Sequence, residues 1–213
     1  MKKFLIASIV LMLALFTVPV FADDFQEGLD AANRGDFERA FDIWEPLAKR
    51  GSALAQFNLG LMHDKGEGVK RNYKMAAKWY KLAARQGNET AQFNLGYMYS
   101  RGIGVKRNYN EAVKWYQLSA GQGNVIAQFN LGVFYIEGRG VRQSYSKAAS
   151  WFRLAAKRGD AEAQFRLGMM YEDGDGVEKD PEKAVRLYRF AADQGHTMAQ
   201  GNPGWMYING NGG

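Results

Sequence analysis

A six-residue phrase that recurs every 36 residues constrains the fold more than any other feature of this sequence. Copies of Ala-Gln-Phe-Asn-Leu-Gly, or a close variant, occupy residues 55–60, 91–96, 127–132 and 163–168. An altered copy, Ala-Gln-Gly-Asn-Pro-Gly, follows at residues 199–204. A fixed period of this length is typical of stacked repeats, in which each unit packs only against its neighbours. The phrase therefore predicts one repeat array rather than separate globular domains.

Each repeat is predicted to contain two helices, termed helix A and helix B. A Gly followed by an N-cap residue precedes helix A, in the pairs Gly51-Ser52, Gly87-Asn88, Gly123-Asn124 and Gly159-Asp160. Gly suits the left-handed position just past a helix end, and Ser, Asn or Asp accepts a hydrogen bond from a first-turn N–H. A second column of N-cap residues precedes helix B, at Asn72, Asn108, Ser144 and Asp180. The pattern predicts an all-α fold, a right-handed α-solenoid of antiparallel helix pairs with period 36.

Helix A is predicted to carry the phrase and to end at a Gly-x-Gly-Val loop, first seen at residues 66–69. Its Ala and Leu fall on one face, and Gly60 has no side chain, so that a neighbouring helix can approach closely. Helix B carries Ala, Trp, Tyr and Ala at helical spacing, first at residues 76, 79, 80 and 83. We expect this whole stripe, including the Trp, to lie in the core.

Residues 1–22 have the pattern of a secretory signal peptide. Lys2 and Lys3 precede an uncharged apolar run over residues 4–18, and small residues flank Phe21 where a signal peptidase cuts. A retained membrane anchor is the alternative, but the run is short for a span of about 20 residues. No Cys follows the run, which excludes a bacterial lipoprotein. We therefore expect cleavage after Ala22 and export to the periplasm, with secretion from the cell as the alternative.

The remaining chain is predicted to divide into an N-terminal capping helical hairpin (23–50), four repeats (51–195) and an incomplete C-terminal repeat (196–213). Pro46 lies inside the second helix of the hairpin and should kink or shorten it. In the last repeat, Pro203 replaces the Leu of the phrase and should break helix A. Residues 208–213 should be frayed, because no later helix holds them. The last repeat is either an altered cap or a truncated copy.

These residues resemble the Sel-one-like repeat (SLR) family, a longer relative of the tetratricopeptide repeat, and its exported bacterial members in particular. The first copy matches the family motif at Ala55, Asn58-Leu59-Gly60, Met62, Gly66, Gly68-Val69, Ala76, Trp79-Tyr80 and Ala83-Ala84. The resemblance covers about residues 25–207. It implies an α-solenoid whose helices A line a concave surface, and a role as a scaffold for protein–protein interactions.

The sequence does not predict a catalytic, metal or cofactor site. The chain has no Cys, which excludes disulfides and thiolate chemistry. It has two His: His63 aligns with a Tyr in the other repeats and is expected to replace a structural aromatic, whereas His196 lies in the N-cap column. No nucleophile elbow or phosphate-binding loop is present. The acidic loop at residues 173–180 lacks the Gly and Glu that a calcium loop requires.

Charge is distributed unevenly along the chain. Residues 49–158 hold 19 basic and 5 acidic residues, a net charge of +14, whereas residues 23–48 have −6 and residues 159–213 have −4. Basic side chains in the loops between helices A and B are predicted to form a basic loop patch of Lys70, Arg71, Lys106, Arg107 and Arg142. Such asymmetry bears on partners. It favours an acidic protein or an anionic envelope component, and nucleic acid is not expected for an exported chain.

The leading hypothesis is an exported, non-enzymatic scaffold that reads a protein partner with helix A residues on the concave surface. The residues expected to contact the partner are Asn58, Leu61, Asn94, Tyr97, Asn130, Val133, Arg166 and Met169. They comprise the fourth residue of the phrase and the residue that follows its Gly, which varies among copies. One alternative is a cell-wall or β-lactam hydrolase, as the resemblance suggests through cysteine-rich relatives. Another is a self-assembling structural unit.

Overall fold

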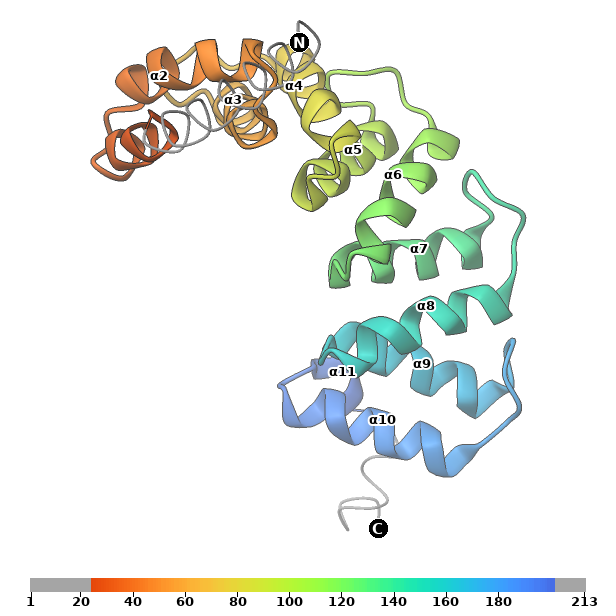
Figure 1. Ribbon diagram of the computed structural model, residues 1–213. Coiled ribbons are helices and arrows are strands. Elements are labelled where there is room, and N and C mark those ends of the chain that lie inside the picture. Colours follow the sequence, from red (N-terminus) through yellow and green to blue (C-terminus); the bar gives the residue numbers. More distant parts are fainter. Residues whose placement is uncertain (1–23, 202–213) are drawn as a thin grey trace, which may run out of the picture. The chain divides into compact units, whose positions relative to one another are not determined.

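The computed structural model of this chain describes residues 24–201, and the regular structure between them is entirely helical (Figure 1). Residues 24–33 form the first helix. The others are α2 (Phe37–Lys49), α3 (Ala53–Lys65), α4 (Tyr73–Arg85), α5 (Glu89–Arg101), α6 (Tyr109–Gly121), α7 (Val125–Glu137), α8 (Tyr145–Lys157), α9 (Ala161–Asp173), α10 (Pro181–Asp193) and α11 (Thr197–Gln200). Helices α3, α5, α7 and α9 are helices A, and α4, α6, α8 and α10 are helices B. The predicted all-α repeat of helix pairs is confirmed.

The chain divides into two compact units. Unit 1 comprises Met1–Met98 and Gly102–Lys106, and unit 2 comprises Tyr99–Arg101 and Arg107–Gly213. Within each unit, helices that follow one another along the chain pack together, as α3 does with α4 and α7 with α8. The predicted signal peptide, Pro203 and residues 208–213 lie outside the described residues.

The predicted N-caps close the first turn of every helix from α2 to α11. Ser52 Oγ accepts a hydrogen bond from the Ala55 N–H at 3.3 Å, and Asn88 Oδ1 accepts one from the Ala91 N–H at 2.8 Å. The same bond recurs at Asp36, Asn72, Asn108, Asn124, Ser144, Asp160, Asp180 and His196. Because each cap is worth about 1 kcal/mol, these residues fix the helix starts that the sequence predicts.

The Gly of the phrase lies under an aromatic ring of helix B. A Cβ added at Gly60 would lie 2.5 Å from the Tyr80 ring, and one at Gly132 would lie 2.4 Å from the Phe152 ring. These separations are far inside van der Waals contact, so no larger residue fits without movement. The predicted close approach of helix B is therefore confirmed, and its partner is an aromatic side chain.

The second Gly of the Gly-x-Gly-Val loop packs against the backbone of the preceding helix B. A Cβ added at Gly104 would lie 2.1 Å from the carbonyl oxygen of Tyr73, and one at Gly140 would lie 2.4 Å from the carbonyl carbon of Tyr109. Both glycines have φ of +68°. A Gly is therefore required at this position for two reasons: its backbone conformation and the close contact between successive repeats.

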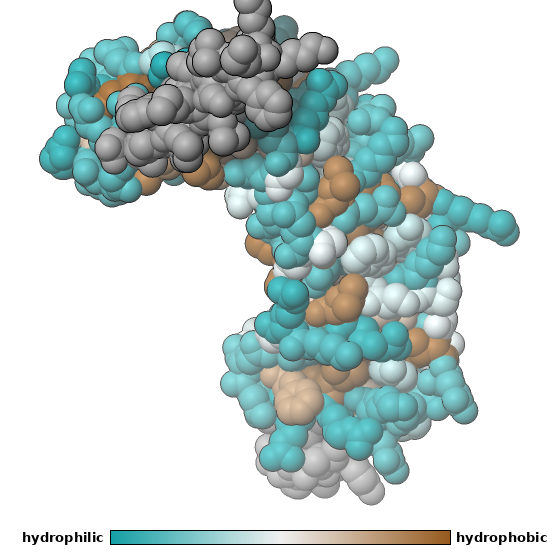
Figure 2. All heavy atoms as spheres, viewed as in Figure 1, coloured by the Kyte–Doolittle hydropathy of each residue, from teal (hydrophilic) through white to brown (hydrophobic). Residues whose placement is uncertain are grey.

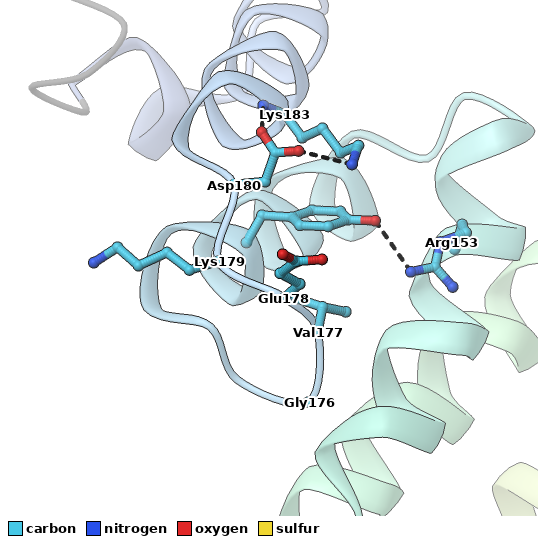
Figure 3. A pocket seen from close by; sticks show the side chains of 8 residues that line it. Arg153, Gly176, Val177, Glu178, Lys179, Asp180 and Lys183 are labelled. Carbon is cyan, nitrogen blue, oxygen red and sulfur yellow. Dashed lines mark hydrogen bonds and ion pairs between the residues drawn. The ribbon is translucent and has the colours of Figure 1, made fainter.

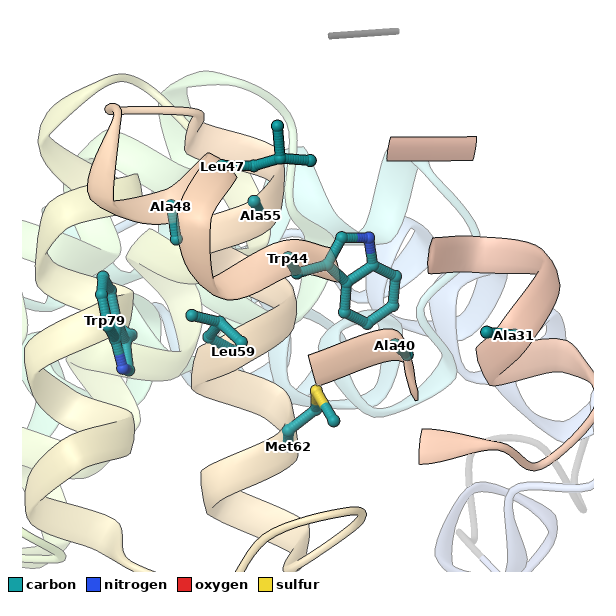
Figure 4. Close-up of a cluster of buried hydrophobic side chains, with 9 residues drawn as sticks. All are labelled: Ala31, Ala40, Trp44, Leu47, Ala48, Ala55, Leu59, Met62 and Trp79. Carbon is teal, nitrogen blue, oxygen red and sulfur yellow. The ribbon is translucent and has the colours of Figure 1, made fainter. Parts of the chain in front are cut away.

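Helix 24–33 and α2 pack with α3 and α4 around a buried hydrophobic cluster that includes Trp44 (Figure 4). Trp44 is buried and its Nε1–H donates to the carbonyl of Phe25 at 3.3 Å. Gly28 lies against the Trp44 ring, where an added Cβ would be 2.3 Å from Nε1. The expectation that Pro46 shortens its helix is wrong, since α2 has 13 residues like α3. Pro46 is exposed in the last turn, where water can satisfy the carbonyl that its ring leaves unpaired.

The buried stripe of helix B differs from the prediction at the Trp position. Tyr80, Tyr116, Phe152 and Tyr188 are almost completely buried. Trp79 is buried too, but Trp115, Trp151 and Leu187 at the same position are only half-buried. The Tyr position is therefore fully inside the core, whereas Trp151 and Leu187 pack against the core and stay partly exposed in unit 2.

Four glutamines of the phrase are buried, a role that the sequence did not predict. The Nε2 of Gln56, Gln92, Gln128 and Gln164 donates to the carbonyl of the residue eight positions earlier, at the end of the preceding helix. In unit 2, Gln194 Nε2 donates to Gln164 Oε1 at 2.8 Å. The glutamines therefore tie the last turn of one helix to the first turn of the next.

The Phe of the phrase differs in burial between repeats, which gives a stability test. Phe93 is half-buried, whereas Phe165 is 7% exposed. Truncation of a buried Phe to Ala costs about 3–5 kcal/mol, and partial burial lowers that cost. We expect Phe165→Ala to reduce the free energy of unfolding by about 3–5 kcal/mol and Phe93→Ala by about 1–2 kcal/mol. Urea unfolding followed by circular dichroism measures both, and equal losses would contradict the difference in burial.

Candidate functional site

Two grooves in unit 1 lie at equivalent positions of successive repeats. The first, of about 280 Å³, lies between helix 24–33 and α3 and has α2 as its floor. The second, of about 240 Å³, is lined by α3, α4 and α5 and the loop that follows. Five lining residues of the first correspond, 36 positions on, to five of the second, in the pairs Phe37/Tyr73, Asn58/Asn94, Leu61/Tyr97, Met62/Met98 and Glu67/Ile103. The helix A face of unit 1 therefore carries a repeated groove.

Four of the residues expected to contact a partner line these two grooves. Leu61 is half-buried and Tyr97 is 43% exposed, so both side chains are accessible. Asn58 Nδ2 donates to the carbonyl of Leu54 at 3.0 Å, within its own helix. The Asn94 side chain forms a hydrogen bond with the Tyr80 hydroxyl. The side chains of Leu61 and Tyr97 are therefore exposed enough to contact a partner, and those of Asn58 and Asn94 are hydrogen-bonded within the chain.

The hydroxyl of Tyr80 lies beneath the second groove. It donates to Asp64 Oδ2 at 3.3 Å, and Asp64 lines the groove. Burial raises the pKa of Tyr80, and the Asp64 carboxylate raises it further, so the phenol stays protonated and keeps donating. In unit 2, Tyr188 donates in the same way to Glu172. These bonds connect the helix B core to the end of helix A.

The other four predicted contact residues lie in unit 2. Asn130 and Val133 of α7 are half-buried, and Met169 of α9 is 38% exposed. Arg166 is exposed and its Nε lies 2.8 Å from Glu162 Oε1. Burial acts to raise the pKa of Glu162, but hydrogen bonds from His196 and Arg166 outweigh it and hold the pKa below its usual value. Arg166 occupies the position of the Asn in the other copies of the phrase and is an ion-paired cation at the surface.

The basic loop patch is exposed throughout but is divided between the units. Lys70, Arg71 and Lys106 belong to unit 1, and Arg107 and Arg142 to unit 2. The Arg71 guanidinium lies 5.5 Å from the centre of the Tyr73 ring, and that of Arg107 lies 5.6 Å from the Tyr109 ring. Each unit therefore presents its own cations beside the first residue of a helix B.

The aromatic residues that form the floors of the grooves were not predicted from the sequence. Phe37 begins α2 and Tyr73 begins α4, and Tyr109 and Tyr145 occupy the same position in α6 and α8. Tyr73 and Tyr145 are exposed, although they begin amphipathic helices. An aromatic residue repeated directly after an N-cap, outside the buried stripe, is the signal that identifies this column.

His63 replaces the Tyr of other repeats as a structural aromatic, as expected. Its ring is half-buried and meets Phe41 edge to face, with centroids 6.0 Å apart. Its Nδ1 is buried and has no hydrogen-bond partner among residues 24–201. Burial lowers the pKa of His63, although a hydrogen bond to the Lys70 backbone opposes the shift. The neutral ring is therefore the form that fits this position.

The lowered pKa of His63 predicts a loss of stability in mild acid. A folded-state pKa below the unfolded value of about 6.5 means that the unfolded chain binds the proton more readily as pH falls. His63→Tyr removes this linkage and restores the residue of the other repeats. We expect the urea midpoint of the native chain to fall more between pH 7.5 and 5.5 than that of His63→Tyr. Parallel pH dependences would contradict the assignment.

His196 is an N-cap rather than a ligand in the described part of the chain. Its Nδ1 accepts a hydrogen bond from the Ala199 N–H at 3.1 Å, and its Nε2 lies 2.8 Å from Glu162 Oε2. The ring also packs on Phe165, with centroids 4.7 Å apart. Both nitrogens are therefore engaged in holding α11 against α9.

Between residues 24 and 201, no three His, Asp or Glu side chains are grouped so that they could hold a metal ion. Asp180, in the acidic loop, caps α10 and lies 2.7 Å from Lys183 Nζ. The helices of this part of the chain are also too short or too polar to cross a membrane.

Comparison with known proteins identifies the repeat. The family model described as Sel1 repeat matches residues 53–88, 90–124, 125–160 and 161–196. A comparison with curated proteins found no match. A solved protective antigen of uropathogenic Escherichia coli strains, which displays an SLR fold, is 34% identical with a TM-score of 0.84, over 91% of this chain and 42% of that chain. A Sel1 repeat protein from Oxalobacter formigenes is 38% identical with a TM-score of 0.78, over 83% of this chain and 72% of that chain. The present chain thus spans less than half the length of the Escherichia coli antigen.

Proposed function

This chain belongs to the Sel1 repeat family, and we propose that it is an exported scaffold that binds a protein partner on the helix A faces of its repeats. Sel1 repeats generally mediate protein–protein binding. The observation that carries the proposal is the repeated groove of unit 1, in which Leu61 and Tyr97 occupy equivalent positions. A partner segment that runs across both repeats would meet the same type of groove twice.

The chemistry of the grooves indicates how such a partner is held. Met62 and Met98 supply apolar lining, and Leu61 and Tyr97 give the two grooves different rims. Exposed aromatic side chains contribute strongly to binding because they bury a large area at low entropy cost. The variable position would therefore select the partner, while the repeated positions provide a common apolar floor.

The charge of the chain supports a partner with acidic character. Lys70 and Arg71 lie in the loop between α3 and α4, close in sequence to Tyr73 in the floor of the second groove. Exposed cations around an apolar groove raise the rate of association with an acidic partner and make it sensitive to salt. Export through residues 1–22 would make an envelope protein or another anionic envelope component available.

A quantitative pull-down from an envelope extract tests the proposal. The bait is the purified chain, compared with Leu61→Asp and Tyr97→Asp, which place a carboxylate in each groove. We expect at least tenfold lower recovery of specific partners with either variant, because burying an unpaired charge is costly. Lys78→Asp is the matched control, since Lys78 is exposed on α4 and lines neither groove.

Charge reversal tests the electrostatic component separately. Lys70→Glu with Arg71→Glu should reduce recovery at low salt and have a smaller effect at high salt. Recovery that is unchanged by Leu61→Asp and Tyr97→Asp would overturn the helix A proposal. Unchanged recovery with the Lys70 and Arg71 variants alone would remove only the acidic-partner component. Turnover of a cell-wall or β-lactam substrate by the purified chain would instead favour the hydrolase alternative.

A further inference from the structure

A further groove lies on the helix B side of unit 2, between α8 and α10 with α9 as its floor (Figure 3). It consists of two adjoining hollows of about 260 and 440 Å³ that share Arg153, Tyr171 and Lys183 as lining residues. The sequence reasoning did not predict it, because neither wall contains residues of the variable helix A row. We term it the helix B groove.

One end of the helix B groove is apolar. Its lining there includes the buried Leu167, the half-buried Leu187 and Phe190, which is 56% exposed. Leu118 and Leu154 occupy the position of Phe190 in α6 and α8 and are also about half exposed. Apolar residues accordingly interrupt the hydrophilic surface in several places (Figure 2). Phe190 is thus an exposed apolar side chain directly beside the hollow.

Cations surround the apolar end. Arg153 Nη2 donates to the Tyr171 hydroxyl at 3.1 Å, which fixes the guanidinium at the rim and leaves its other N–H groups available (Figure 3). Lys183 Nζ lies 5.3 Å from the centre of the Tyr171 ring and 2.7 Å from Asp180 Oδ2. Arg186 also lines the apolar end. Hydrogen bonds from Lys183 lower the pKa of Asp180, and the charge of Arg186 contributes to this shift. The ion pair of Asp180 is made by Lys183, so the guanidinium groups of Arg153 and Arg186 can still receive a carboxylate from a partner.

From this arrangement we propose that the helix B groove docks a protein segment in which a large apolar side chain lies next to carboxylates. The apolar side chain fills the hollow beside Phe190, over Leu167 and Leu187. The neighbouring carboxylates bind the guanidinium groups of Arg153 and Arg186, where charge-assisted hydrogen bonds are strongest. The groove would serve a different partner segment from the helix A face, so the two proposals stand independently.

The shape and charge of the groove favour a peptide over an anionic membrane. A hollow of about 260 Å³ accepts a single side chain, whereas a bilayer requires a broad projecting apolar surface. Glu178 and Asp180 line the other end of the groove and would be repelled by anionic head groups. A protein segment can place its own polar or basic residues there.

Selection of random peptides displayed on phage, with the purified chain as bait, tests the proposal. Selected peptides are then synthesised with a fluorescent label, and their affinity is measured by fluorescence polarisation. Some peptides should bind the Phe190→Asp variant more weakly than the native chain but bind the Tyr97→Asp variant equally well. These peptides bind the helix B groove rather than the helix A face. We expect these peptides to combine an aromatic or large aliphatic residue with adjacent Asp or Glu.

Their affinity should fall at least tenfold for Arg186→Glu, whereas Arg189→Glu should change it less than twofold. Arg189 is exposed on α10 but does not line the groove, which makes it the matched control. When the Arg186→Glu variant is used as the bait, the selected peptides should carry basic residues in place of acidic ones. Because Arg186 and Phe190 are exposed, both variants should keep the helical circular dichroism of the native chain.

Three outcomes would overturn the proposal. The first is that no selected peptide distinguishes Phe190→Asp from the native chain. The second is enrichment without acidic residues. The third is that the groove has another occupant, shown either by phosphatidylglycerol vesicles that bind the chain and lose binding with Phe190→Asp or by self-association in sedimentation that is lost with this variant. The vesicle result would assign the groove to a membrane and the sedimentation result to a second copy of the chain.

Discussion

Gly104→Ala is expected to destabilise the chain by at least about 3 kcal/mol. Gly104 has φ of +68°, which costs an L-residue about 1–2 kcal/mol. An added Cβ would also lie 2.1 Å from the Tyr73 carbonyl oxygen, and a backbone atom cannot move aside like a flexible side chain. The loop would have to separate from α4, which removes the contact between successive repeats. Urea unfolding followed by circular dichroism measures the loss.

Two other glycines separate the causes. Gly87 also has positive φ, but nothing lies within 4 Å of an added Cβ. Gly87→Ala should therefore lower the free energy of unfolding by only about 1–2 kcal/mol. Gly121→Ala lies within α6, also in open space, and should stabilise the chain by about 0.5–1 kcal/mol. If Gly104→Ala and Gly87→Ala cost the same, the backbone contact at Gly104 has no energetic role.

Leu131→Ala is expected to reduce the free energy of unfolding by about 2–5 kcal/mol. Leu131 is the Leu of the third phrase and is completely buried. Its truncation leaves a cavity in the helix A side of the core, whose rigid helix pairs can collapse only in part. Thermal or urea unfolding of the purified variant gives the magnitude.

Leu118→Ala is the matched control for this core residue. Leu118 lies on the helix B surface of unit 2 and is 51% exposed, so its truncation should change stability by no more than about 0.5 kcal/mol. A large loss with Leu118→Ala would mean that this side chain is covered in solution. It would then support contact between the helix B surface and a second copy of the chain.

The helix pattern was predictable because local chemistry determines it. Asn72, Asn88 and their equivalents cap the helices that the sequence places after them, and Gly66 ends α3 in the left-handed conformation. These choices depend on one or two neighbouring residues, so a repeated sequence displays them directly. The close approach at Gly60 was equally predictable from the sequence, although the sequence did not show that an aromatic ring fills the space.

The grooves were less predictable because they form between elements that are distant in sequence. The helix A row was expected from its variability, and Leu61 and Tyr97 do line grooves. Their floors come from Phe37 of α2 and Tyr73 of α4, each of which lies between the walls of its groove. The helix B groove escaped prediction for the same reason, since Arg153 and Phe190 lie 37 positions apart.

The Trp column shows the limit of periodicity arguments. The spacing of Trp115 and Tyr116 within α6 places both near one helical stripe, and the sequence reasoning assigned both to the core. In the structure Tyr116 is buried while Trp115 is half-buried. Neighbouring residues differ by about 100° around a helix, so which of them faces the partner helix depends on the packing of the pair.

The central claim, that a partner occupies the helix A groove of unit 1, is tested most directly by site-specific photo-crosslinking in the envelope. A benzophenone amino acid is placed at position 97, in the groove, or at position 78, on exposed α4. The account predicts a crosslinked protein partner with the probe at Tyr97, weakened by Leu61→Asp, and little crosslinking from Lys78. Equal crosslinking from both positions, or none from position 97 under conditions where the partner co-purifies, would contradict it.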